Sequence, residues 1–225
     1  MRLARVILGD QGRARPPERI DRADLEQAID PGGLGPGLEA ARAIVLAEGF
    51  AGLTMRKIAQ AIEYSPGTIY LHFAGRDEIA RELCVVGFAD LVAALAPAAA
   101  APEPRARLES LAEAYVRFGL TQVETYRLIF MEDPTIVKAI YERPEAGGPD
   151  DPGAQAYGLL LGGFLALQAE GRLAGPAEPT VLTDAFWSAL HGVVSLKLTC
   201  PGFPETPAET LVPALIRSLL DGMLA

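Results

Sequence analysis

The sequence predicts an all-α protein. Apolar residues beyond Leu38 recur at intervals of three and four positions, the spacing that places them on one face of a helix. Few segments alternate between apolar and polar residues, and no run of β-branched residues is bounded by hairpin turns. We therefore expect helices separated by Pro- and Gly-rich connections, and no strands.

The composition indicates a globular chain. Half of the 225 residues are hydrophobic, which suffices for one large domain or for a small domain joined to a larger one. No uninterrupted apolar run reaches the roughly 18 residues of a membrane helix, and the N-terminus lacks the continuous apolar region of a secretory signal. Cys84 and Cys200 fit neither a disulfide framework nor a zinc site. We expect a cytoplasmic protein without a membrane partner, cofactor, metal or catalytic residue.

The net charge of −9 argues at first against nucleic acid as a partner, because phosphate binding requires basic patches. The charge is unevenly distributed, however. Residues 83–225 hold 9 basic and 17 acidic side chains, whereas residues 37–82 hold 5 and 6. Between positions 54 and 76, Arg56, Lys57 and Arg76 are opposed only by Glu63. A small basic face on an acidic body suits a DNA-binding unit attached to a separate domain.

Residues 1–36 are expected to form a flexible N-terminal extension, because they mix Arg, Pro and Gly and end in a Pro- and Gly-rich run. Asp21 can cap one short helix that reaches Ile29. The arginines at positions 2, 5, 13, 15 and 19 leave two interpretations open. They either contact the DNA minor groove or phosphates, or belong to a solubilising tail.

Three helices are expected next. The first begins at about Leu38 and ends before Gly49, a residue suited to stop a helix. The hydroxyl of Thr54 can cap the second helix. Ser65 can cap the third, whose first position is taken by Pro66, where no amide hydrogen is required. The layout is therefore a helix-turn-helix.

The third helix has two distinct sides. At about 100° per residue, Pro66, Ile69 and Phe73 fall on the side that packs on Ile58 and Ile62. The other side and its flanks would meet a DNA major groove, with Thr68 at the end that points at base edges. The residues on these outward surfaces are Gly67, Thr68, Tyr70, Leu71 and His72.

Helix starts supply further candidate DNA contacts. Thr54 and Arg56 open the second helix, whose free amides and positive dipole end suit a phosphate, and Arg76 opens a fourth helix in the same way. Lys57 is a weaker phosphate candidate. Gly67 weakens its helix by up to about 1 kcal/mol relative to Ala, which makes sense where backbone approaches DNA closely. These features alone leave open both DNA binding and the plain packing of a three-helix unit.

Longer helices are expected in the rest of the chain. Asp77 and Glu78 suit the positive first turn of the fourth helix, which should run to about Ala96 and end before Pro97. A short helix over residues 136–141 is the least defined element. The remaining helices are expected at about residues 105–120, 122–131, 155–172, 180–199 and 207–224.

The run from Glu48 to Ala59, followed by Ser65–Phe73 and by Arg76-Asp77-Glu78, resembles the N-terminal domain of TetR/AcrR-family regulators over about residues 38–85. The resemblance implies a homodimer that binds operator DNA and whose affinity is altered by a small molecule in the C-terminal domain. Arg76 stands where the family commonly has Lys, which keeps the charge. The positions that match DNA-contacting positions of the family are Thr54, Arg56, Ser65, Gly67, Thr68, Tyr70, His72 and Arg76.

The C-terminal region carries a shorter resemblance. The segment from Trp187 through His191 to Gly192 is similar to the Trp, His and Gly signature of one C-terminal subclass of the family. His191 either serves a ligand site or merely satisfies a polar contact between packed helices. Large apolar residues provide candidates for lining a pocket for a small apolar effector, although most should be ordinary core: Phe88, Leu91, Tyr115, Phe118, Tyr126, Phe130, Met131, Tyr157, Phe164, Trp187 and His191.

The last two helices are candidates for a dimer interface, because two helices from each chain can form a four-helix bundle about a two-fold axis. The interface candidates are Leu190, Val194, Leu211, Leu215 and Leu219. The expected domains are an extension over residues 1–36, a DNA-binding domain over 37–83, and a ligand-binding and dimerisation domain over 84–225.

Two other classes of protein were weighed. An enzyme is disfavoured, because two histidines 119 positions apart form no helical zinc pair and the chain lacks a nucleophile elbow, a P-loop and a dinucleotide fingerprint. The alternative is a helical small-molecule-binding or protein-interaction domain without operator function.

Overall fold

The computed structural model describes residues 35–70, 73–131 and 147–225. The chain divides into two units, residues 1–36 and 37–225, and apart from the first residue of α2 the helices belong to the second. The expected helices at 21–29 and 136–141 and the N-terminal arginines lie outside the described residues. The elements are α2 (Pro36–Glu48), the 3₁₀ turn η1 (Phe50–Gly52), α3 (Met55–Ala61), α4 (Pro66–Ile69), α5 (Arg76–Ala99), α6 (Pro104–Thr121), α7 (Val123–Phe130), α9 (Pro152–Ala169), α10 (Pro179–Thr199) and α11 (Ala208–Met223).

The all-α prediction is confirmed: within the described ranges the extended contacts amount to one isolated bridge, between Leu173 and Leu224. Several helices start at a proline in the first turn, where a missing amide hydrogen costs nothing. Glu103 caps α6 through a bond from the Ala106 amide (2.6 Å), so this helix begins slightly earlier than expected. Asp151 caps α9 in the same manner.

Helix α5 continues past the point where the sequence predicted its end. Pro97 lies inside the last turn, and the helix ends at Ala99. A proline so close to the C-terminus removes only one backbone hydrogen bond, and its carbonyl still accepts from the Ala100 amide at 3.4 Å. The expectation of a stop before Pro97 was therefore wrong by about one turn.

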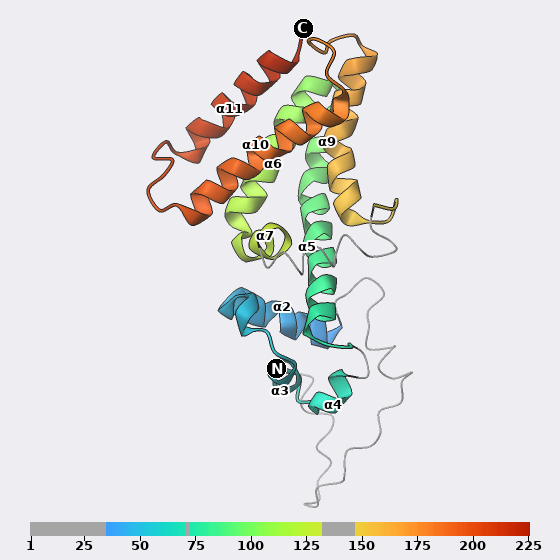
Figure 1. The fold of residues 1–225 in the computed structure, drawn as a ribbon, viewed down its shortest axis with the longest axis vertical. Helices are drawn as coiled ribbons and strands as arrows, with labels where there is room; N and C mark the ends of the chain where they lie inside the picture. Colours follow the sequence, from blue (N-terminus) through green and yellow to red (C-terminus); the bar gives the residue numbers. More distant parts are fainter. Residues whose placement is uncertain (1–34, 71–72, 132–146) are drawn as a thin grey trace, which may run out of the picture. The chain divides into compact units, whose positions relative to one another are not determined.

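The core of the C-terminal helices is built around α5 and α6. Helix α5 packs against α6, α7 and α9, and α6 also contacts α10 and α11. Figure 1 shows α5 and α6 in green, with α9 and α10 beside them. The largest fully buried side chains include Tyr115, Tyr126, Phe164 and Phe186, and the last two meet edge to face at 5.7 Å. The aromatic residues thus supply much of the buried apolar area.

Helix α5 is long and apolar enough, by length and composition alone, to cross a membrane. The sequence predicted no helix of this kind, because its apolar residues do not form one uninterrupted run. Its buried residues, among them Leu83, Leu91 and Leu95, pack into the common core, and α5 contacts three other helices. These contacts are those of a central helix in a globular domain.

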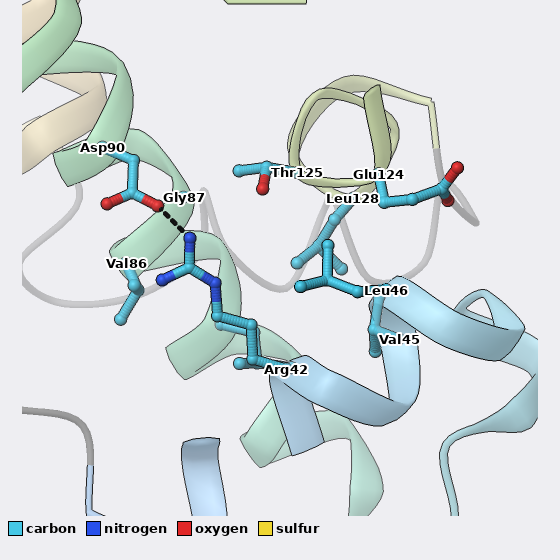
Figure 2. Close-up of a pocket in the computed structure, with 10 residues that line it drawn as sticks. Arg42, Val45, Leu46, Val86, Gly87, Asp90, Glu124, Thr125 and Leu128 are labelled. Carbon is cyan, nitrogen blue, oxygen red and sulfur yellow. Dashed lines mark hydrogen bonds and ion pairs between the residues drawn. The ribbon is translucent and has the colours of Figure 1, made fainter. Parts of the chain in front are cut away.

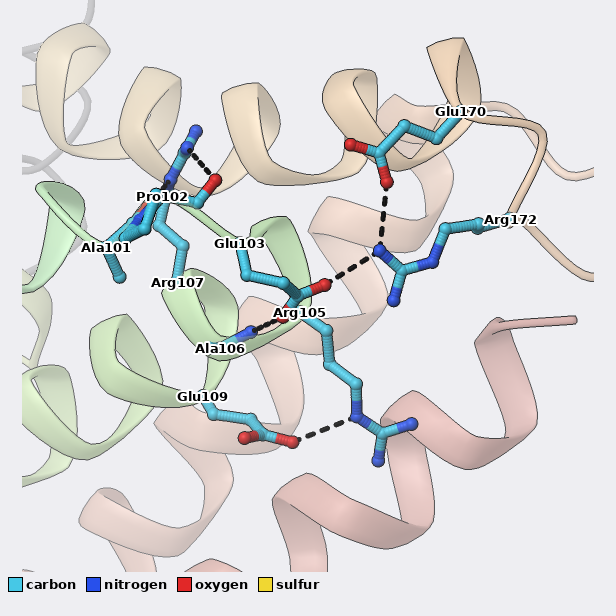
Figure 3. A network of polar contacts seen from close by, with 9 residues as sticks. All are labelled: Ala101, Pro102, Glu103, Arg105, Ala106, Arg107, Glu109, Glu170 and Arg172. Atoms are coloured by element: carbon cyan, nitrogen blue, oxygen red, sulfur yellow. Dashed lines mark hydrogen bonds and ion pairs between the residues drawn. The ribbon is translucent and has the colours of Figure 1, made fainter.

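Polar contacts join the ends of α6, α9 and α11. Arg172 binds the carboxylates of Glu103 (2.7 Å) and Glu170 (2.9 Å), and Arg105 binds Glu109 (3.0 Å), as Figure 3 shows. Arg105 also reaches Asp221 of α11 at 2.6 Å. All of these pairs are substantially exposed, so solvent screens their attraction. They fix how the helix ends meet and add little to overall stability.

Candidate nucleic-acid interface and ligand cavity

Helices α3 and α4 are held together by a few buried side chains. Ile58 and Ala59 of α3 are fully buried, and Ile69 is the buried anchor of α4. Ile62 and Phe73 pack against the same cluster as half-buried residues. Pro66 is exposed, contrary to the expectation that it faces the core, because it sits at the cap end of a helix of only one turn. Ile69 is therefore the main side chain that packs α4 against α3.

The turn between α3 and α4 contains a left-handed residue. Glu63 has φ 59°, and the Tyr64 amide bonds back to the Ala59 carbonyl at 2.9 Å. This pattern closes the C-terminus of α3 in the way that glycine usually does, and a residue with a side chain is strained there. The turn is thus tightly defined despite the absence of glycine.

The predicted caps of both helices are confirmed. The hydroxyl of Thr54 accepts from the Lys57 amide, and that of Ser65 accepts from the Thr68 amide, each at 3.2 Å. The two hydroxyls of Ser65 and Thr68 lie 2.9 Å apart. Helix α4 spans one turn, whereas the sequence predicted a helix that continues to Phe73. The Phe73 amide still bonds to the Ile69 carbonyl at 3.0 Å.

The outward side of α4 is open to solvent. Gly67 is exposed, Thr68 is half-buried, and Tyr70 is 55% exposed. A Cβ atom built on Gly67 would meet only the Ser65 hydroxyl, at an ordinary contact distance of 3.7 Å. Nothing inside the described protein therefore requires a glycine here. The candidates Leu71 and His72 lie outside the described residues.

The basic candidates differ in how much they are engaged within the chain. Arg56 is exposed, whereas the Lys57 ammonium pairs with the Glu48 carboxylate. Arg76 donates to the Phe50 carbonyl at 2.8 Å and lies 4.1 Å from the centre of the Phe50 ring. Its Nε is buried and has no partner among the described residues. Arg56 is the most accessible of the three, while Arg76 braces η1 against α5.

A cavity of about 420 Å³ opens among α5, α7, α9 and α10. Four of the predicted pocket residues line it: Phe88, Phe130, Tyr157 and Trp187. The Tyr157 and Trp187 rings stack with centroids 5.9 Å apart, and Phe88 meets Phe130 edge to face at 5.5 Å. The volume lies within the roughly 300–1,000 Å³ typical of small-molecule sites.

The sequence missed two acidic residues that line this cavity, Asp151 and Asp184. Asp184 accepts a hydrogen bond from the Tyr157 hydroxyl at 2.8 Å. Burial first, and then the bond to Asp184 and its charge, raise the pKa of the Tyr157 phenol, which stays protonated at neutral pH. The Pro-x-x-Leu-x-Asp spacing at the start of α10 was the available signal, but an acidic residue in a helix start has many ordinary uses.

A chain of hydrogen bonds runs behind the cavity wall. Trp187 Nε1 donates to the Tyr115 hydroxyl (3.1 Å), which lies 3.1 Å from the Tyr126 hydroxyl, and this in turn lies 2.6 Å from Nδ1 of His191. Because the indole N–H can only donate, the Tyr115 hydroxyl accepts from Trp187, whereas either tyrosine hydroxyl can be the donor in the next bond and the role of Nδ1 depends on the tautomer of His191. The chain links α6, α7 and α10.

Burial sets the protonation of this chain. Desolvation lowers the pKa of His191, which keeps the imidazole neutral and its Nδ1 able to accept. Desolvation, followed by the nearby Tyr115, raises the pKa of Tyr126 far above its usual range. Tyr115, Tyr126 and His191 are not among the described residues that line the cavity, and His191 makes the polar contact between helices that was the alternative to a ligand role.

The remaining pocket candidates lie elsewhere. Leu91 and Phe164 are fully buried in the core, Phe118 is nearly so, and Met131 is half-buried against it. Two of the interface candidates, Leu190 and Val194, are fully buried within the subunit, so the expectation that they contact a partner was wrong. They point inward because α10 packs on α6 and α9 with that face. Leu211, Leu215 and Leu219 of α11 are half-buried against the core.

Side chains of α2 meet those of α5 and α7 at a small contact, called the joint below. Arg42 of α2 pairs with Asp90 of α5 at 2.6 Å, and Figure 2 shows Val45 and Leu46 beside the helix that carries Thr125 and Leu128. The space between them is only about 10 Å³, no more than one water molecule occupies. The joint is therefore a packed contact and offers no room for a ligand.

Helices α5 and α7 approach each other at Gly87. A Cβ atom at this position would lie 2.6 Å from Cγ2 of Ile129 and 3.2 Å from Cγ2 of Thr125. Gly87 neighbours Phe88 of the cavity, and α7 carries both Leu128 of the joint and Phe130 of the cavity. The cavity and the joint thus share two helices.

No group of three or more potential metal ligands occurs in the parts of the chain that the structure describes. A capped helix-turn-helix with an exposed second helix, followed by a helical domain, is the layout of many DNA-binding regulators of transcription. The chain belongs to the TetR family. Residues 38–83 match the family of bacterial regulatory proteins of the tetR type, and residues 108–221 match the tetracyclin repressor-like C-terminal domain. Members of this family act as regulators and are not enzymes.

Solved structures share the fold. A Rhodococcus sp. RHA1 protein of unknown function is 25% identical, with a TM-score of 0.69 over 87% of this chain and 99% of that one. The ketosteroid transcriptional regulator KstR2 of Mycobacterium tuberculosis is 21% identical, with a TM-score of 0.59 over 85% and 94%. The regulator PfmR of Thermus thermophilus is 19% identical, with a TM-score of 0.57 over 83% and 97%. No curated protein matches the chain by sequence.

Proposed function

We propose that the protein is a one-component repressor that binds a palindromic operator as a homodimer in the cytoplasm and responds to a small effector. The observation that carries the proposal is the contrast between the buried and the exposed residues of α4. Ile69 is buried and seats the helix, while Gly67 and Tyr70 are exposed and make no contact that the fold requires. An outward surface of this kind is typical of a recognition helix.

The residues of α3 and α4 divide into two proposed roles. Thr68 reads base edges from the N-terminal turn of α4, and Gly67 lets backbone approach the groove. Tyr70 contacts the phosphate wall beside the groove, as we also propose for His72 with Leu71 next to it. Thr54, Ser65 and Arg56 lie at helix starts where amides and positive charge suit phosphates, with Lys57 and Arg76 in supporting positions.

Dimerisation follows from the size of the operator. Two recognition helices must enter successive major grooves about 34–36 Å apart, which one subunit cannot span. Helices α10 and α11 remain the proposed interface. The outward residues of these helices, such as Val181 (58% exposed) and Leu196 (37% exposed), replace the inward Leu190 and Val194 in that role.

The aromatic cavity is the proposed effector site. Phe130 and Leu128 lie two residues apart on α7, one in the cavity and the other in the joint with α2. A ligand that displaces α7 therefore also acts on α2, which is the helix that precedes the helix-turn-helix. A coupling of about 1–3 kcal/mol suffices to change operator occupancy.

We propose that the C-terminal domain belongs to the Trp-His-Gly subclass. Trp187 and His191 are joined through the hydroxyls of Tyr115 and Tyr126, which supports a shared structural role for the two signature residues. In this proposal His191 stabilises the wall behind the effector without touching it, while Trp187 lines the cavity.

The function is tested by gel shift with the DNA upstream of the protein's own gene. The wild type is expected to give a specific complex. The double substitution Thr68→Ala with Tyr70→Ala should abolish that complex and leave the circular dichroism spectrum unchanged, because neither side chain holds the core. Thr121→Ala, which changes an exposed threonine at the end of α6, outside α4 and the proposed interface helices, is the matched control and should bind normally.

Two outcomes contradict the proposal. If a measured operator complex survives the double substitution, α4 is not the reading element. If the folded wild type forms no specific complex, the protein is instead a helical small-molecule-binding or protein-interaction domain without operator function.

A further inference from the structure

The residues that line the effector cavity limit the chemical class of ligand that it can bind. Four aromatic rings line the space, and the Tyr157 and Trp187 rings stack on each other, with centroids 5.9 Å apart and an angle of 25° between their planes. The indole N–H of Trp187 already donates to Tyr115, so Trp187 offers its ring and not a hydrogen bond. Aromatic faces attract cations through their quadrupole, and sets of such rings recognise quaternary ammonium groups.

The charged residues of the described cavity lining are both acidic. They are Asp151 and Asp184, and this described part of the lining contains no Lys, Arg or His. Asp151 accepts the amides of Gly147 (2.7 Å) and Gly153 (3.1 Å) at the start of α9, which directs its charge to the helix end. Asp184 accepts from the neutral hydroxyl of Tyr157, which orients its carboxylate without neutralising it.

These two observations exclude one ligand class and favour another. An anionic ligand would lose its hydration beside two carboxylates and gain no cationic partner among the lining residues that the structure describes. A neutral apolar ligand would gain burial against the rings and leave the carboxylate of Asp184 unused. A ligand with an apolar body and one positive charge uses both features of the site.

We propose that the cavity binds an organic cation, with the charged amine or quaternary ammonium beside Asp184 and the apolar body among Phe88, Phe130, Tyr157 and Trp187. The inference rests on the proposed function, because it takes this cavity to be the effector site. It goes further by giving the effector a charge.

Trp187 is the single tryptophan of the chain, so its fluorescence reports on the cavity directly. Binding is measured at low salt with three probes of similar size. These are benzyltrimethylammonium, its uncharged carbon isostere neopentylbenzene, and the anion 4-phenylbutyrate. We expect the cation to bind at least about tenfold more tightly than the isostere, with no measurable binding of the anion. Raising the salt concentration should weaken the cation alone.

Asp184→Asn provides the matched test, because asparagine keeps the acceptor for Tyr157 and loses the charge. The affinity for benzyltrimethylammonium should fall about tenfold, as expected for the loss of a nearby charge, and that for neopentylbenzene should not change. Glu205→Gln removes an equal charge beyond the opposite end of α10 and should leave both affinities unchanged.

Several results would overturn the inference. They are equal or tighter binding of the isostere, tighter binding of the anion, no binding of the cation, and an unchanged cation affinity in Asp184→Asn. The probe comparison on the wild type decides by itself if the variant does not fold. Operator binding is scored separately by gel shift without probe. A protein that binds the cation but no operator contradicts the proposed function and leaves the ligand class standing.

Discussion

The outward side of α4 and the core of the C-terminal domain place similar residue types in opposite situations. Tyr70, which caps the end of α4, is 55% exposed, whereas Tyr115 and Tyr126 are fully buried and bond to each other. A Cβ atom on Gly67 would meet one atom at an ordinary contact distance, whereas Gly87 leaves no room for a methyl group. The exposed side chains of α4 are free to contact a partner, while those of the C-terminal core hold the fold together. Substitutions should therefore separate binding from stability at α4 and combine the two in the C-terminal domain.

The largest contrast is expected between two aromatic residues. Phe164→Ala removes a fully buried ring that packs on Phe186, and should lower the free energy of unfolding by about 3–5 kcal/mol. Tyr70→Ala should change it by less than about 0.5 kcal/mol, because surface substitutions seldom cost more. Urea denaturation followed by circular dichroism measures both. Equal losses in the two variants would remove the basis of the comparison.

A smaller difference in the free energy of unfolding is expected between substitutions at Gly87 and at Gly67. Gly87→Ala forces a methyl group against the buried Ile129 and should cost about 1–3 kcal/mol of unfolding free energy. Gly67→Ala should leave stability unchanged or raise it by about 0.5 kcal/mol, since alanine favours helix. Operator affinity of Gly67→Ala should nevertheless fall, because the added methyl group occupies the space for DNA backbone. A gel shift in which Gly67→Ala binds as the wild type does would show that α4 does not approach the groove at this residue.

A substitution at Glu63 tests whether the left-handed turn before α4 lowers the stability of the folded protein. Glu63→Gly removes a side chain from a left-handed position at φ 59° and should raise the free energy of unfolding by about 1 kcal/mol. Thermal unfolding detects this as an increase in Tm. Gln60→Gly, in the preceding turn of α3 where the backbone is helical, is the control and should lower Tm. A destabilised Glu63→Gly would mean that its side chain has a stabilising contact.

The smallest expected effect depends on pH. Burial lowers the pKa of His191 in the folded state below its ordinary value near 6.5, so the unfolded chain binds more protons between these two values. Stability should therefore be full above about pH 6.5 and decline as the pH falls toward the lowered pKa. His191→Asn keeps an acceptor for Tyr126 and should reduce this slope. Urea midpoints measured from about pH 5 to 7 give the comparison, and identical slopes would show that His191 is not desolvated.

Local features of the fold were predictable from the sequence. Thr54 and Ser65 determine helix starts by accepting from neighbouring amides, and Pro66 takes a first helical position that needs no amide hydrogen, so these roles could be read directly and are confirmed. The family resemblance added the layout of the first helices. The error at Pro97 arose because a proline weakens a helix by the loss of a backbone hydrogen bond but does not always end it.

Features that depend on distant neighbours were not predictable. Leu190 and Val194 lie on an apolar face, but the sequence does not say whether that face meets the same subunit or another one. Only the packing of α10 against α6 and α9 settles it. The same limit applies to Asp184, which joins the cavity because Tyr157, 27 positions away, lies beside it. Pocket membership is a property of packed helices and leaves no pattern within any one of them.

The missing side chain at Gly87 has a mechanical consequence. Because Ile129 of α7 lies directly against the backbone of α5 there and Phe130 meets Phe88 edge to face, α7 has no free space in which to move independently of α5. We expect the two helices to move as one unit, so that motion begun by a molecule beside Phe130 would reach Val45 and Leu46 through α5 and α7 together.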